Sequence, residues 1–458
     1  MTQLAFLILF AAVVAGYVLN RMAAEQIRTG GGRLHSLVGF HGSFAALVIG
    51  LPGFILIILW ILFQGAIIDR SVMSGLPAGL LDGLKPGAVS LVLAEVQSIA
   101  VGQVFGTPEP WKIDAADHLN RLYGYSRWGM LAIVAVLSLV LLVYARSRVA
   151  TEFRARHGAE RIVLGLMIAC STIAVFTTIG IVLSLVFESI KFFRLVPLNE
   201  FLFGLRWEPQ IAIRADQVAG AGAFGVIPVI VGSFLIMTIA LVVAVPIGLM
   251  SAIYLNEFAS RRFRLWVKPV LEILAGVPTV VYGFFAILVV APFLREFGAT
   301  LGLPVSPNTA LAAGLCMAIM LIPFISSFAD DALTAVPQSL RDGSLALGAT
   351  RSETMLKVLF PAAIPGIVGG VLLAVSRAIG ETMIVVMAAG IIAKLTINPL
   401  DTVTTVTVQI VSLLIGDTEF DNPKTLAAFA LGMLLFIITL GINILALRIV
   451  RKYRELYD

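Results

Sequence analysis

Nine stretches of this chain are apolar over a length that can cross a membrane, and this property limits its fold more than any other. A membrane-spanning helix needs about 20 mostly apolar residues to cover a hydrocarbon core about 30 Å thick. We therefore expect nine spans, near residues 4–19, 38–63, 129–145, 162–187, 224–254, 267–294, 308–328, 364–393 and 425–448. Because lipid offers the backbone no hydrogen-bond partners, each span is expected to be helical.

The composition places the chain among all-α integral membrane proteins. Of its 458 residues, 59% are hydrophobic and 13% are charged, whereas soluble domains carry about 25% charged residues. The net charge of +5 does not indicate nucleic-acid binding, because the basic residues gather in short loops between the apolar stretches. The sequence contains neither a G-x-x-x-x-G-K-S/T phosphate-binding loop nor an H-E-x-x-H zinc motif. We therefore expect no ATPase site, cofactor or metal in the chain itself.

Arginine and lysine in the loops predict the orientation of the chain. Basic loops occupy residues 20–36, 146–161 and 256–268, and the C-terminal tail 448–458 is also basic. With nine spans these segments all fall on one side of the membrane, and their excess of positive charge marks that side as cytoplasmic. The N-terminus is then expected on the outer side and the C-terminus in the cytoplasm.

The chain is expected to divide near residue 150. Residues 1–150 form an N-terminal membrane extension with three spans and a long outer loop, and residues 160–455 hold six spans and every distinctive motif. The extension contains a tenth apolar stretch at 86–105, which one glutamate and two glutamines interrupt. We expect this stretch to be an interfacial or folded helix and not a span.

A long cytoplasmic loop at residues 330–362, between the seventh and eighth spans, predicts a helix-turn-helix. Pro337 is expected to begin the first short helix, Gly348 to break it, and Pro361 to end a second amphipathic helix. Three leucines of this segment are available for burial, Leu340, Leu345 and Leu347. By itself, the pattern also fits an ordinary structured loop.

This loop resembles the EAA loop of ABC-importer permeases, whose pattern is E-A-A-x3-G-x9-I-x-L-P. The glycine, the spacing and the final proline match, whereas D-G-S stands in place of E-A-A, and Val and Phe replace Ile and Leu. The aligned positions are Asp342, Gly343, Ser344, Gly348, Val358, Phe360 and Pro361. The resemblance implies that the short helix inserts into a groove on a cytoplasmic ATPase, so that a chain without a phosphate-binding loop can be driven by ATP.

Three further stretches resemble the phosphate-specific transport permeases of the PstC type, over about residues 160–455. They are FGVIPVIVGSFLIMTIALVVAVPIGLMSAIYLNEFA, KPVLEILAGVPTVVYGFFAI and SRAIGETMIVVMAAG. The resemblance implies a type I (MetI-like) six-helix permease core in a bacterial inner membrane. It also implies three kinds of partner: a PstA-like permease, a PstB-like ATPase dimer and a periplasmic PstS-like binding protein. The minimal form of this family lacks residues 1–150, to which we assign no task.

Arg377 and Glu381 stand within an otherwise apolar stretch, LLAVSRAIGETMIVVMAAG. An ionised side chain at bilayer depth costs about 2.5 to 3.5 kcal/mol on insertion scales, so such residues suggest a function. Four residues apart on one helix, the two would share a face and could pair. The family resemblance assigns the R-A-I-G-E segment to phosphate passage. In that role Arg377 would hold two phosphate oxygens and Glu381 would balance its charge when the path is empty.

Other interpretations remain open at this point. The two charges could form a structural ion pair or contact a neighbouring subunit. The position of Glu272, near Lys268 in the first turns of its span, favours a helix-start or structural role for this residue. The chain could instead be an ABC permease for another oxyanion or small solute, or a self-sufficient secondary transporter or channel, although no inverted repeat is apparent.

Overall fold

The computed structural model describes residues 1–458 except 77–85, 104–107, 211–221, 416–421 and 455–458. The predicted number of spans is confirmed: the described residues contain nine helices long and apolar enough to cross a membrane. The chain forms two compact units, Met1–Phe176 and Thr177–Asp458.

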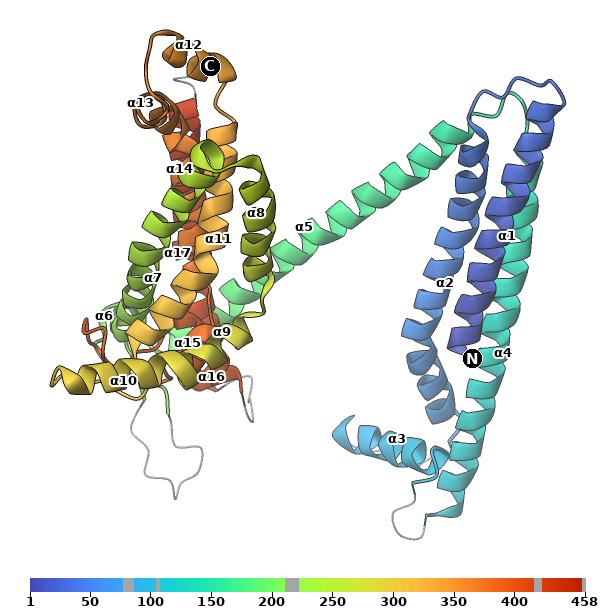
Figure 1. The fold of residues 1–458 in the computed structure, drawn as a ribbon. Helices are drawn as coiled ribbons and strands as arrows, with labels where there is room; N and C mark the ends of the chain where they lie inside the picture. Colours follow the sequence, from blue (N-terminus) through green and yellow to red (C-terminus); the bar gives the residue numbers. More distant parts are fainter. Residues whose placement is uncertain (77–85, 104–107, 211–221, 416–421, 455–458) are drawn as a thin grey trace. The chain divides into compact units, whose positions relative to one another are not determined.

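The first unit is built on three long helices that pack side by side (Figure 1), α1 (Thr2–Thr29), α2 (Val38–Ser74) and α4 (Pro110–Ser147). Their shared core contains Leu9, Ile49 and Met130. The helices approach closely where glycines face neighbours: a Cβ on Gly16 would lie 2.4 Å from the Ile49 side chain. Small residues allow such close helix contacts in lipid, where packing replaces the hydrophobic effect.

The stretch at 86–105 is not a span, as predicted, although residues 104 and 105 lie outside the described part. It contains α3 (Pro86–Ala100), a helix of 15 residues, shorter than the roughly 20 needed to cross. Its polar side chains have partners nearby: Glu95 accepts a 2.7 Å bond from Lys112, and Gln97 donates to Asp69 at 3.2 Å. These contacts explain why polar residues interrupt the apolar stretch.

The helix α5 (Ala155–Leu195) runs from the first unit into the second. The second unit continues with α6 (Leu198–Phe203), a hairpin of β1 (Trp207–Glu208) and β2 (Ala223–Phe224), α7 (Ile227–Ile253) and the π-helical turn η1 (Tyr254–Phe258). In the antiparallel hairpin Trp207 pairs with Phe224. Its aromatic side chains pack with Phe192 of α5 in a small core.

The most buried span of the second unit is α11 (Ala310–Thr334). The remaining elements are α8 (Arg261–Gly276), α9 (Thr279–Phe285), η2 (Ala286–Val290), α10 (Ala291–Thr300), α12 (Gln338–Ala346), α13 (Arg351–Thr354), η3 (Met355–Leu359), α14 (Phe360–Ile379), α15 (Met383–Ala388), α16 (Val406–Leu414) and α17 (Pro423–Arg454). Helices α7 and α14 pack directly against α11. Figure 1 shows α12 and α13 at one end of this unit and α10 and α16 at the other.

Two of the predicted spans are interrupted. The stretch 267–294 divides because α8 ends at Gly276 and a new helix begins at Thr279. Pro278 forces the residue before it into an extended conformation, and Val277 has ψ 130°. The stretch 364–393 was expected to be one helix, but α14 ends at Ile379 and a separate short helix, α15, follows.

Candidate functional site

The loop at residues 330–362 forms the predicted helix-turn-helix. Helix α12 begins directly after Pro337, and Gly348 follows its end with φ +86°, a backbone conformation that favours glycine. The second helix starts with a capping box, in which Thr350 and Glu353 each satisfy the other's backbone amide. The turn at Gly348 therefore separates two helices, each with a defined start.

The expectation that Pro361 ends the second helix is wrong. The helix continues from Arg351 through Pro361 to Ile379 as one candidate span of 29 residues. The turn before the proline is π-helical, Met355–Leu359, and such turns shift the register of backbone hydrogen bonds, so the helix tolerates a residue that cannot donate one. Spacing alone did not reveal this turn.

The surface of α12 carries exposed apolar side chains. Leu340 and Leu345 are each 41% exposed and Leu347 is 90% exposed, although the sequence suggested burial of all three. Asp342 and Gly343 are also exposed, whereas Ser344 shares a 3.0 Å hydrogen bond with Thr354. Within this chain these five residues thus form an exposed surface, and the Ser344 hydroxyl joins α12 to the second helix.

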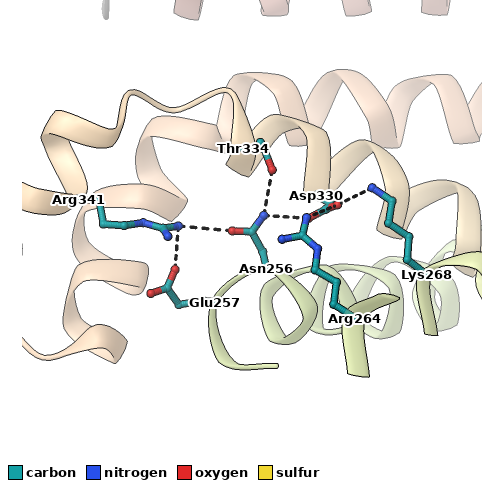
Figure 2. A network of polar contacts seen from close by, with 7 residues as sticks. All are labelled: Asn256, Glu257, Arg264, Lys268, Asp330, Thr334 and Arg341. Carbon is teal, nitrogen blue, oxygen red and sulfur yellow. Dashed lines mark hydrogen bonds and ion pairs between the residues drawn. The ribbon is translucent and has the colours of Figure 1, made fainter. Parts of the chain in front are cut away.

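A polar network lies beside this loop (Figure 2), centred on Asp330 near the end of α11. The carboxylate is 7% exposed and accepts two bonds from Arg264, at 2.9 and 3.0 Å, and one from Lys268 at 2.8 Å. Both cations belong to α8. A buried carboxylate is tolerated when it is paired and hydrogen-bonded, and these contacts join α8 to α11.

The second part of the network joins α12 to the π-helical turn η1. Arg341 of α12 lies 2.8 Å from the carboxylate of Glu257, which is 7% exposed. Asn256 connects the two parts: its amide nitrogen donates to Asp330 at 2.8 Å and to Thr334 at 3.0 Å, and its oxygen accepts from Arg341 at 3.5 Å. Sequence reasoning missed this network. In the sequence Asn256, Glu257 and Asp330 stand just beyond the ends of apolar stretches, but nothing there indicates that they pair.

Arg377 lies in the last turn of α14, and its side chain is exposed within this chain. Its guanidinium sits 5.6 Å from the ring centre of Phe324, near the middle of α11. In the described part of the chain it forms no ion pair. The arginine therefore lies beside the middle of α11, next to the point where α14 ends.

The expected pairing of Arg377 with Glu381 is wrong, because the helix that would place them on one face ends at Ile379. One oxygen of Glu381 instead accepts hydrogen bonds from the backbone amides of Met383, at 3.0 Å, and Ile384, at 3.3 Å. The carboxylate thereby satisfies amides at the start of α15. The structure does not bring the two charged groups together.

Comparison with known proteins follows the division into two units. Residues 244–455 match the family described as binding-protein-dependent transport system inner membrane component. Residues 6–177 match a family described as phosphate ATP-binding cassette transporter. The first match covers α8, α11, α12 and Arg377, and the second covers the N-terminal extension, to which the sequence alone assigned no task.

Relatives that share about a third of the aligned residues identify the family. The phosphate transport system permease protein PstC 1 of Mycobacterium tuberculosis is 34% identical over 55% of this chain and 81% of its own length. The chain belongs to the PstC family of ABC transporter permeases. The probable ABC transporter permease protein YqgH of Bacillus subtilis is 33% identical, over 59% of this chain and 84% of that protein. A probable PstC of Methanocaldococcus jannaschii is 30% identical over 53% and 80%.

Membership of this family fixes the general architecture. The chain is a multi-pass membrane subunit with the type I importer permease fold, and such permeases act in a complex with an ATPase and a substrate-binding protein. One solved structure, the MetNI methionine ABC transporter in an inward-facing conformation, is 22% identical, with a TM-score of 0.37 over 50% of this chain and 94% of that chain.

Proposed function

We propose that the protein is the transmembrane permease subunit of an ATP-driven phosphate importer. The observation that carries the proposal is the identity of 30–34% to PstC phosphate permeases over 80% or more of their length. Two partners are proposed on the same basis, a PstA-like permease that completes the translocation path and a periplasmic PstS-like protein that delivers phosphate. The role is a transport role and not an enzymatic one, because ATP would be hydrolysed by a PstB-like ATPase dimer.

The exposed surface of α12 supports the proposed ATPase contact. Leu347 at 90% exposure and the neighbouring Leu340 and Leu345 form apolar surface outside the membrane-spanning helices. Exposed apolar surface of this kind marks protein–protein contact sites. In the proposed complex Asp342, Gly343 and Ser344 lie at this contact, with Gly348 and Pro361 shaping the segment that presents them.

The position of Arg377 supports the proposed phosphate path. Non-helical backbone at membrane depth is tolerated where it is buried in protein or lines a polar cavity, and α14 stops next to Arg377. Helices that break near the middle of the membrane are a common way to build transport sites. A guanidinium without an ionic partner would offer paired donors to phosphate oxygens. Glu381 would contribute to this path by accepting hydrogen bonds from the backbone amides at the start of α15, which fixes the position of that helix.

The experiment that tests this function is reconstitution. The chain is co-expressed with a PstA-like permease and a PstB-like ATPase from the same genome, purified in mild detergent and placed in vesicles with the phosphate-loaded binding protein. We expect ATP-dependent accumulation of radioactive phosphate, and unlabelled sulfate should not reduce this accumulation. Equal competition by sulfate would reject phosphate as the preferred substrate, and accumulation without ATP or an ATPase partner would favour a secondary transporter.

A topology prediction follows from charge. Arg21, Arg28 and Arg33 follow the first span, so residue 1 should be periplasmic and residue 458 cytoplasmic in the bacterial inner membrane. Fusions of alkaline phosphatase and green fluorescent protein to each end measure this. Phosphatase activity at the N-terminus and fluorescence at the C-terminus are expected. Fluorescence at both ends would show that the number of membrane crossings is even.

A further inference from the structure

The polar network places one arginine between α12 and the transmembrane helices. In the described part of the chain, Arg341 makes all the side-chain hydrogen bonds and ion pairs that join α12 to η1, α8 or α11. The other polar attachment of α12, from Ser344 to Thr354, goes to the helix that follows it. Polar contacts can therefore transmit a displacement of α12 to α8 and α11 only through Arg341.

Burial makes these contacts sensitive to position. Glu257 and Asp330 are each 7% exposed at the side chain, and a buried carboxylate that loses its partner is strongly destabilised. Glu257 has Arg341 as its ionic partner, 2.8 Å away. If α12 moves away, Glu257 is left without that partner, unless η1 moves with α12. The cost of leaving the buried Glu257 carboxylate unpaired thus favours joint movement of α12 and η1.

Asn256 links the movement of η1 to α11 and, through Asp330, to α8. It is the residue before Glu257 on η1, and it accepts from Arg341 while donating to Asp330 and Thr334 of α11. Asp330 is in turn held by Arg264 and Lys268 of α8. The turn that carries Asn256 and Glu257 is π-helical, and such turns occur frequently at functional sites.

We propose that Arg341, Asn256 and Asp330 form a relay that transmits displacement of α12 to α8 and α11. The ion pair between Arg341 and Glu257 makes η1 move with α12. Asn256 of η1 then displaces Asp330 of α11 through its hydrogen bond. The ion pairs of Asp330 with Arg264 and Lys268 extend the displacement to α8. These are positioning residues, since none of them is proposed to touch phosphate or ATP. The inference rests on the proposed function, in which an ATPase moves α12.

The test separates coupling from folding with matched variants of the reconstituted complex. Arg341→Met removes the ion pair with η1, and Arg341→Met/Glu257→Gln removes both charges, so that no buried carboxylate is left unpaired. Asn256→Ala interrupts the middle of the relay and leaves both groups of ion pairs in place. Arg262→Met is the control, because Arg262 is exposed and forms no ion pair among the described residues.

The readout is the ratio of ATPase activity with the phosphate-loaded binding protein to activity without it. We expect the ratio to fall about fivefold or more in Arg341→Met and Asn256→Ala, in the range usual for coupled sites, and to stay unchanged in Arg262→Met. The double variant should regain thermal stability of the complex but not the ratio. A double variant that regains both would show that the network is only structural, and a normal ratio in Arg341→Met would overturn the relay.

Phosphate uptake by the wild-type complex is measured separately. A wild-type complex whose ATPase is stimulated but which accumulates no phosphate would overturn the proposed function. The variants would still report on the relay through the stimulation ratio. The two proposals can therefore fail independently.

Discussion

Replacement of Arg377 by glutamine should abolish most phosphate uptake while leaving the assembled complex able to hydrolyse ATP. Hydrogen bonds to a charged group contribute about 1.5–3 kcal/mol, which corresponds to a loss of about 10- to 150-fold. Folding should be affected little, because the side chain is exposed and, among the described residues, it forms a cation–π contact with the Phe324 ring but no hydrogen bond or ion pair. A cation–π contact of this kind contributes about 0.5–1 kcal/mol. Initial uptake rates and complex yield measure the two effects.

Two further substitutions separate charge from geometry. Arg377→Lys should restore uptake only in part, because an ammonium keeps the charge but not the planar pair of donors. Glu381→Gln should have a small effect, since its amide oxygen can still accept from Met383 and Ile384. If Arg377→Gln transports phosphate at the wild-type rate, the arginine is no part of the path. If it prevents assembly, its role is to contact a neighbouring subunit.

The class of the protein and the number of its spans could be predicted from sequence because both depend on local properties. Length and hydropathy decide whether a helix can cross a membrane, and the nine predicted spans correspond to nine candidate spans in the described residues. The turn at Gly348 could also be predicted, because only glycine adopts φ +86° readily. These features need no knowledge of tertiary neighbours.

The errors arose where neighbouring backbone decides the outcome. Apolar composition does not distinguish one helix from two, so the interruptions at Pro278 and after Ile379 were not predicted. The opposite error occurred at Pro361, where the proline predicted the end of a helix. The helix continues there because a π-helical turn precedes the proline. The network around Asp330 joins residues 60 to 90 positions apart in sequence, and a single sequence contains no signal for such pairs.

The second large effect is expected at Gly348. Gly348→Ile should leave membrane insertion and assembly with the partner permease intact, while lowering uptake and binding-protein-stimulated ATPase activity together. An L-residue in the left-handed conformation costs about 1–2 kcal/mol, a factor of about 5 to 30 in the population of the native turn. A Cβ at this position would meet no other atom within 4 Å. The penalty therefore comes from the backbone alone.

The size of the loss should follow the backbone preference of the new residue and not its volume. Gly348→Asn should retain most activity, because asparagine adopts positive φ more readily than other side-chain-bearing residues. Gly348→Ala, although smaller than asparagine, should lose more. This order distinguishes a turn that positions α12 from a surface that only needs space. If isoleucine transports normally with its ATPase bound, the loop does not set the docking geometry, and if asparagine fails as badly as isoleucine, the space around Gly348 is filled by the partner.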